Sequence, residues 1–90
     1  MSSKEKNLLQ RARKLDSEAL EMIYDTYSDK LYAYAVRRVG NAQQAEDFVA
    51  ETFSRFLQAL KSGGGPEDHL QAYLYRITHN LITDHYRREP

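Results

Sequence analysis

Apolar residues in this chain recur at helical spacing over long stretches, and glycine and proline occur only at the joints between those stretches. Between residues 45 and 60 the core-type positions follow i, i+3, i+4 spacing without a gap: Ala45, Phe48, Val49, Thr52, Phe53, Phe56, Leu57 and Leu60. This spacing places them on one face of an α-helix. The apolar–polar alternation of a half-buried strand is never sustained. The chain is therefore expected to fold as packed helices without a sheet.

The joints between the apolar stretches carry helix-capping residues. A short helix is expected over about residues 4–14, and Asp16 or Ser17 is placed to cap a second helix that ends near residue 39. Gly40 suits the left-handed residue that closes a helix, because it has no Cβ to clash. Asn41 should begin the third helix, with Gln44 completing a capping box.

The second and last helices complete the predicted core. On the second helix one apolar stripe includes Leu20, Ile23, Tyr24, Tyr27, Leu31, Tyr34 and Ala35, and a second includes Tyr32, Val36 and Val39. After the three glycines at 63–65, Pro66 is a good first residue for a helix that reaches about residue 88. Its predicted core stripe is Leu70, Tyr73, Leu74, Ile77, Leu81 and Ile82. We predict an all-α fold, a compact antiparallel bundle of three long helices plus a short N-terminal helix.

Composition narrows the classes of protein further. Ninety residues, of which 41% are hydrophobic, are enough for one folded domain with a modest core. No apolar run could span a bilayer and no secretory signal is visible, so a cytoplasmic location is expected. The absence of cysteine excludes disulfides and thiolate metal sites.

The formal net charge is zero, but the charges are unevenly distributed. Residues 41–68 are mainly acidic, whereas residues 69–88 carry three arginines, all three histidines and a single acidic residue. Such an asymmetry is typical of a domain with two partners of different charge, although ordinary surface variation also produces it.

Two motifs in this order resemble region 2 of bacterial sigma factors of the extracytoplasmic-function class. The first is Ala45-Glu46-Asp47-Phe48-Val49-Ala50-Glu51-Thr52-Phe53, and the second is Tyr73-Leu74-Tyr75-Arg76-Ile77-Thr78-His79-Asn80 with Asp84, Arg87 and Arg88. The resemblance covers roughly residues 8–88. It implies that residues 1–90 form one region 2 domain, without the second helical domain with which the family normally reads the minus-thirty-five element.

The resemblance implies a protein-docking face on the third helix. In the family this face binds the clamp coiled coil of the largest subunit of core RNA polymerase, and an anti-sigma factor is a further partner. Ala50 departs from the family pattern, which commonly has glutamine there. Spacing alone favours an ordinary solvated helix face, and it is the resemblance that points to docking. The residues expected to bind core polymerase are Asp47, Ala50, Glu51, Ser54, Arg55 and Gln58.

The resemblance also implies recognition and melting of the promoter minus-ten element, with one base of the non-template strand flipped against the loop at residues 62–69. Arginine can neutralise phosphate, asparagine can read a base edge, and aromatic rings can stack on unpaired bases. The loop is expected to be mobile until DNA binds, although a plain linker or solvated surface would have a similar sequence. The expected DNA-binding residues are Lys61, Gly63, Gly64, Gly65, Tyr73, Arg76, His79, Asn80, Thr83, Arg87 and Arg88.

Two other classes of function are alternatives to a sigma factor. A metal-dependent enzyme could draw ligands from Glu46, Glu51, His79, Asp84 and His85, but His-Glu-x-x-His and paired Glu-x-x-His spacings are absent. The glycine run also lacks the lysine and hydroxyl of a phosphate loop. We therefore expect no catalysis, metal or cofactor. The other alternative is a helical protein-interaction module that binds polymerase or a regulator without reading DNA.

Overall fold

A computed structural model describes residues 3–88 and contains four helices in that range. They are α1 (Ser3–Arg13), α2 (Ser17–Val39), α3 (Ala42–Lys61) and α4 (Leu70–Arg88). The described part of the chain contains no strand. The predicted all-α class, with three long helices and one short one, is confirmed.

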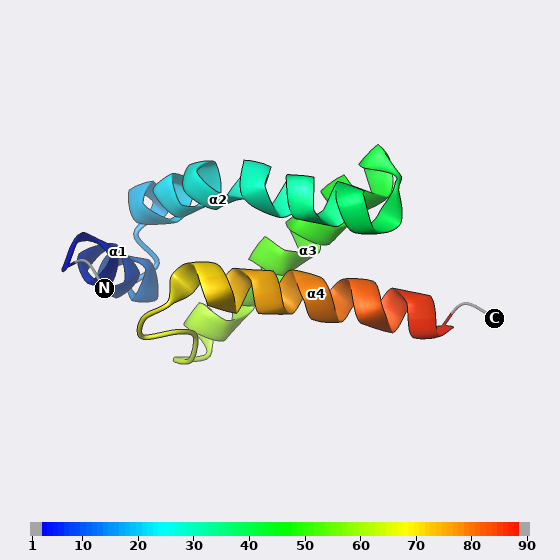
Figure 1. Cartoon of the computed structure of the whole chain (residues 1–90). Helices are drawn as coiled ribbons and strands as arrows, with labels where there is room; N and C mark the ends of the chain where they lie inside the picture. Colours follow the sequence, from blue (N-terminus) through cyan, green and yellow to red (C-terminus); the bar gives the residue numbers. More distant parts are fainter. Residues whose placement is uncertain (1–2, 89–90) are drawn as a thin grey trace.

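The three long helices pack along one another, and the short helix closes one end (Figure 1). α2 and α4 lie side by side and run in the same direction, while α3 returns behind them. α1 lies beside the first turns of α2 and near the loop that precedes α4. Consecutive long helices are therefore antiparallel, as predicted. The molecule measures 42 × 23 × 22 Å along its principal axes.

The core is built from the predicted stripes, with one buried polar contact at its centre. Phe56 is its largest side chain and lies among Leu9, Ile23 and Leu74. The hydroxyls of Thr52 on α3 and Thr78 on α4 are fully buried and lie 2.7 Å apart. Each also lies within hydrogen-bond distance of a carbonyl four residues earlier, at 2.8 and 3.1 Å. Within residues 3–88 every buried side-chain nitrogen and oxygen has a partner, so this contact stabilises the α3–α4 crossing.

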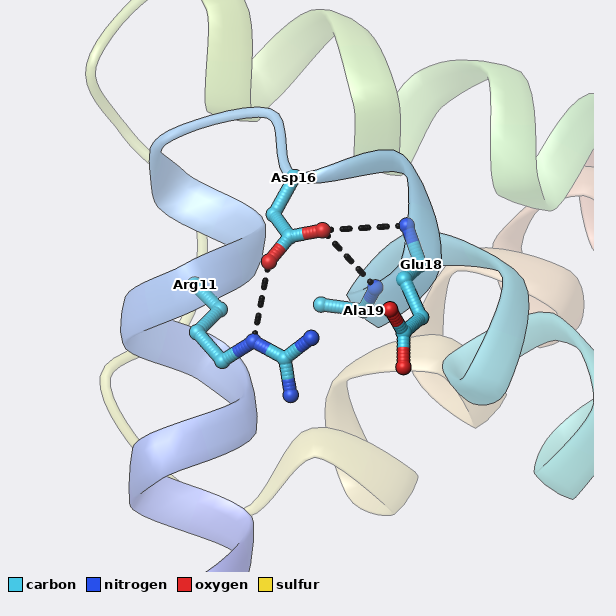
Figure 2. Close-up of polar contacts among 4 residues, drawn as sticks. All are labelled: Arg11, Asp16, Glu18 and Ala19. Carbon is cyan, nitrogen blue, oxygen red and sulfur yellow. Dashed lines mark hydrogen bonds and ion pairs between the residues drawn. The ribbon is translucent and has the colours of Figure 1, made fainter.

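Asp16 caps α2, as one of the two predicted candidates (Figure 2). Its carboxylate accepts from the amides of Glu18 and Ala19 at 3.0 and 3.4 Å, and from Nε of Arg11 at 2.9 Å. The Arg11 hydrogen bond is the largest influence on Asp16 and, with the two amides, holds the pKa of its carboxyl below the usual value. The capping residue thus also links α1 to α2.

Replacing Asp16 with asparagine tests this link, because asparagine keeps the cap acceptor and removes the charge. A depressed folded-state pKa contributes stability that is fully present above the unfolded value of about 3.9 and is lost as pH falls through the folded value. We expect the wild type to be more stable than Asp16→Asn near neutral pH, and the difference to shrink below about pH 4. Urea unfolding across a pH series measures it. The same pair should then be compared in chains that also carry Arg11→Gln. If the stability difference between the Asp16 chain and the Asp16→Asn chain changes with pH as much there as in the presence of Arg11, the role given to Arg11 is contradicted.

At the corner between α2 and α3, two of three predicted capping contacts are formed. Gly40 closes α2 with φ of 69°, and its amide donates to the carbonyl of Val36 at 2.8 Å. The side chain of Asn41 accepts from the amide of Gln44 at 2.8 Å. The reciprocal half of the capping box is not formed, because the Gln44 side chain lies 2.9 Å from Nε2 of His85 on α4. A contact between distant helices has replaced a local one.

Two core predictions differ from the structure. α4 begins at Leu70 and not at Pro66, which is buried in the preceding loop. Tyr24 was placed on a core stripe but is 49% exposed, and the centroid of its ring lies 4.9 Å from that of Phe53. Residues 66–69 stay outside α4 because α1 contacts the loop and helps to hold it. Tyr24 is exposed because it lies at the edge of its apolar stripe.

Candidate functional site

The predicted docking residues of α3 all lie at the surface. They form what we call the α3 ridge: Asp47, Ala50, Glu51, Ser54, Arg55 and Gln58, every one exposed. The residues on the other side of the helix are buried against α2 and α4: Ala45, Val49, Thr52, Phe56 and Leu60. Because the buried set follows i, i+3, i+4 spacing, the ridge is forced outward along nearly the whole helix.

The ridge carries one internal ion pair. Nε of Arg55 donates to the carboxylate of Glu51 one turn earlier, at 3.3 Å, and the two side chains are 55% and 51% exposed. Such an exposed pair contributes little stability and is readily exchanged for an outside partner. The ridge therefore offers carboxylates to a partner at small internal cost.

The predicted DNA-binding residues of α4 lie along the length of the helix. We call this surface the α4 face; it comprises the exposed residues Arg76, His79, Asn80, Arg87 and Arg88 and the half-buried Thr83. Arg76 and Arg87 are eleven positions apart, which is about 16 Å along a helix. The arrangement is an elongated surface and not a single pocket, and this shape suits an extended strand.

Tyr73 is half-buried, as the sequence analysis expected for a residue at a core-stripe position. Its ring packs edge-on against Phe56, with centroids 6.0 Å apart. It lies near the start of α4, next to the loop and about three helical turns before Thr83. Because the residue is not fully buried, packing and contact with a base are compatible at this position.

The end of α2 adds a cation that the sequence analysis missed. Nη1 of Arg38 donates to the hydroxyl of Tyr34 at 3.0 Å, and that hydroxyl lies 3.0 Å from Nδ1 of His79. With the Arg38 hydrogen bond accepted, the hydroxyl can donate to Nδ1, which leaves the ring proton on Nε2. Arg38 therefore extends the α4 face onto α2. The adjacent Arg37-Arg38 pair at the end of the predicted second helix was the available signal, but only the fold shows that it meets His79.

The far end of α4 is held in place by aromatic side chains. The hydroxyl of Tyr86 donates to the carbonyl of Arg38 at 3.2 Å, and the ring of His85 packs edge-on against Phe48 at 5.6 Å. His85 also meets the side chain of Gln44. This histidine, considered above as a metal ligand, thus has a packing role that fixes the orientation of the last turns of α4.

The loop between α3 and α4 is compact. After Lys61, which is exposed, the amides of Gly63 and Gly64 donate back to the carbonyls of Leu60 and Ala59 at 3.0 and 2.8 Å. Gly65 has φ of 93°, and a Cβ there would lie 3.0 Å from a methyl group of Leu60. The positive φ favours glycine at this position, and a side chain would also press on Leu60. The loop mobility expected from three glycines stays a prediction, but the structure shows restraints on it.

Residues 3–88 contain no group of three or more histidine, aspartate or glutamate side chains close enough to hold a metal ion. Over the same range, none of the helices has the length and apolar character needed to cross a membrane. The two predicted surfaces are both exposed and lie on different helices, so they are not buried against each other.

Comparison with known proteins identifies the family. The Sigma-70 region 2 family model matches residues 23–89. The ECF RNA polymerase sigma factor BldN of Streptomyces coelicolor is 35% identical over 86 residues, covering 96% of this chain and 33% of BldN. SigW of Bacillus subtilis, also an ECF sigma factor, is 33% identical over 84 residues, covering 93% of this chain and 44% of SigW. The chain thus spans less than half the length of these relatives.

A solved structure agrees with these matches. A chain of the 1.8 Å RsbN–BldN complex is 37% identical and superposes with a TM-score of 0.75, covering 87% of this chain and 56% of that one. The sequence match and the structural match agree, and the family model covers α3, the loop, all of α4 and most of α2. This chain therefore belongs to the sigma-70 region 2 family, among the ECF RNA polymerase sigma factors.

Proposed function

We propose that this chain docks on core RNA polymerase through the α3 ridge and recognises and melts the promoter minus-ten element with the α4 face and the loop at residues 62–69. Residues 1–90 would act as one domain in the cytoplasm. Sigma factors are transcription initiation factors and not enzymes, which agrees with the expectation that the chain catalyses no reaction.

The observation that carries the proposal is the presence of two exposed surfaces of different character on one small body. The α3 ridge has exposed carboxylates at Asp47 and Glu51, whereas the α4 face has exposed guanidinium groups. The ridge and the face belong to different helices, and we propose that the two partners bind them at the same time. Family membership supports core polymerase and promoter DNA as these clients.

The chemistry of the α4 face suits DNA whose strands are separating. Arginines neutralise phosphates of any sequence, and Asn80 offers both donors and an acceptor to a base edge. Tyr73 is only half-buried, so its ring is available for contact with an unpaired base. With no net charge on the whole chain, binding to DNA alone should be weak, so we propose that the face acts chiefly when the chain is docked on polymerase.

A regulatory protein could also bind at or near the α3 ridge. The similar solved chain comes from a complex of RsbN with BldN, which shows that a relative of this chain assembles with another protein. We propose that an anti-sigma factor is a further partner of this chain. It would act by covering one of the two surfaces.

Titration of a fluorescent minus-ten non-template oligonucleotide, in the presence of core polymerase, tests the DNA half of the proposal. Arg76→Ala combined with Arg87→Ala should weaken binding and reduce the slope of log affinity against log salt by about 1 for each arginine. The matched control is Lys30→Ala on α2, which removes an exposed cation outside the α4 face. An unaltered slope in the double variant would remove these arginines from the DNA surface.

The same titration separates base reading from phosphate binding. Asn80→Ala should reduce the preference for the minus-ten sequence over a scrambled strand, since it removes a base-edge group and no charge. If the wild-type chain binds core polymerase but no oligonucleotide, with or without the enzyme, the chain is instead a protein-interaction module without a DNA role.

A further inference from the structure

The loop at residues 62–69 is held from outside by the side chain of Arg13 at the end of α1. Nη2 of Arg13 donates to the carbonyls of Pro66 at 2.9 Å and Gly65 at 3.3 Å, and Nη1 donates to the carbonyl of Gly64 at 3.4 Å. These contacts join residues 51 to 53 positions apart in the chain. One guanidinium thus contacts three consecutive loop carbonyls.

A second residue of α1 holds the far end of the loop. The carboxylate of Glu5 accepts from the amide of Leu70, the first residue of α4, at 3.1 Å. The contact gives a partner to one of the amides that the first turn of a helix leaves free, and the preceding residue, His69, has φ of 52°. Glu5 and Arg13 are eight residues apart, about 12 Å along a helix. α1 therefore braces the loop from its glycines to its last residue.

The number and geometry of these bonds make them suited to fixing backbone shape. Arginine presents its donors in a rigid planar fork, so three carbonyls that bind one guanidinium are held in a fixed relation to one another. Without such a restraint, a run of three glycines would sample many conformations. Arg13 and Glu5 lie outside the part of the chain that the family model matches, which begins at residue 23.

We propose that Arg13 is a positioning residue that holds the backbone of residues 64–66 in the shape that captures the flipped non-template base. This inference rests on the proposed function. Capturing a base must offset its unstacking and unpairing, and the restraint that Arg13 places on the loop backbone reduces the entropy lost on binding. Arg13 contributes to selectivity at one base of the strand and leaves phosphate binding by α4 and docking by α3 unchanged.

The test uses a set of minus-ten non-template oligonucleotides that carry each of the four bases, or an abasic site, at each position in turn. Affinity is measured with the chain bound to core polymerase. For Arg13→Ala we expect the preference for the best base over the abasic site, at the captured position, to fall about tenfold, the effect of one charge-assisted hydrogen bond. Affinity for the abasic strand and for core polymerase should stay within about twofold. Arg13→Lys, which supplies one ammonium in place of the fork, should restore only part of the preference.

Lys14→Ala is the matched control, because it removes the same charge from the neighbouring exposed position. It should leave the preference intact. Hydrogen exchange gives a second readout: the amides of residues 63–65 should exchange faster in Arg13→Ala than in Lys14→Ala.

The outcomes distinguish the two proposals. A wild-type preference that Arg13→Ala leaves unchanged, or an equal loss for every oligonucleotide, overturns the role of Arg13 while the proposed function stands. A wild-type chain that binds no oligonucleotide overturns both.

Discussion

Reversing the charge of Asp47 and Glu51 together, by Asp47→Lys and Glu51→Lys, is expected to weaken association with core RNA polymerase by about 30- to 100-fold. Two unit charges 4 Å apart interact by about 1 kcal/mol in water, and reversal turns each attraction into a repulsion of similar size. Two positions amount to about 4 kcal/mol before salt screening, which reduces the effect. Surface plasmon resonance with immobilised core enzyme measures it, and the loss should diminish at high salt.

The control for that pair is Glu18→Lys with Glu21→Lys on α2. These residues are exposed and give the same change in net charge, but they lie outside the α3 ridge. Their reversal should leave core binding within a few-fold of the wild type. If both double variants bind core enzyme as tightly as the wild type does, the α3 ridge is not the docking surface.

Truncating Phe56 to alanine is expected to lower the free energy of unfolding by about 3 to 5 kcal/mol, the usual effect of removing a buried aromatic ring. Phe56 is 2% exposed and packs against Tyr73 of α4. For a domain of ordinary stability, about 5 to 15 kcal/mol, this is a large fraction of the total. Urea unfolding followed by circular dichroism measures the change.

Leu57→Ala provides the comparison for this core substitution. Leu57 is the next residue of α3 and is only half-buried, so its truncation should destabilise the chain clearly less. Equal effects would indicate that the core is centred elsewhere on α3.

The features that could be predicted from the sequence are those that depend on residues close by in the chain. Asp16, Gly40 and Asn41 each act through hydrogen bonds within a few residues of their own position, and each lies at the predicted end of a helix. The outward direction of the α3 ridge followed in the same way from the unbroken apolar stripe behind it. Such features need no knowledge of the neighbouring helices.

The predictions that differed depend on contacts between distant segments. Pro66 was expected to begin the last helix, but the loop around it is held by Arg13, and the helix starts at Leu70 with Glu5 as its partner. Gln44 was expected to complete a capping box, but its side chain reaches His85. In each case a side chain more than forty positions away replaces the local partner, and helix periodicity carries no information about it.

In the candidate site, too, features set by one helix could be predicted, whereas contacts between helices could not. The exposure of Arg76, Asn80 and Arg87 could be predicted from the stripe on the other side of α4, and the structure agrees. The contribution of Arg38 could not, because it depends on α2 and α4 lying side by side in the same direction. The roles of all these residues in DNA binding stay predictions.

The claim that two separate surfaces serve two clients is tested most directly by asking whether core polymerase and the non-template strand bind the chain at the same time. The labelled chain, core enzyme and a minus-ten non-template oligonucleotide would be combined, and the bound species separated by analytical ultracentrifugation. We predict a complex of all three, from which a saturating excess of oligonucleotide releases no chain. Release of the chain from core enzyme as the strand binds would show that both clients use one surface, and would contradict this account.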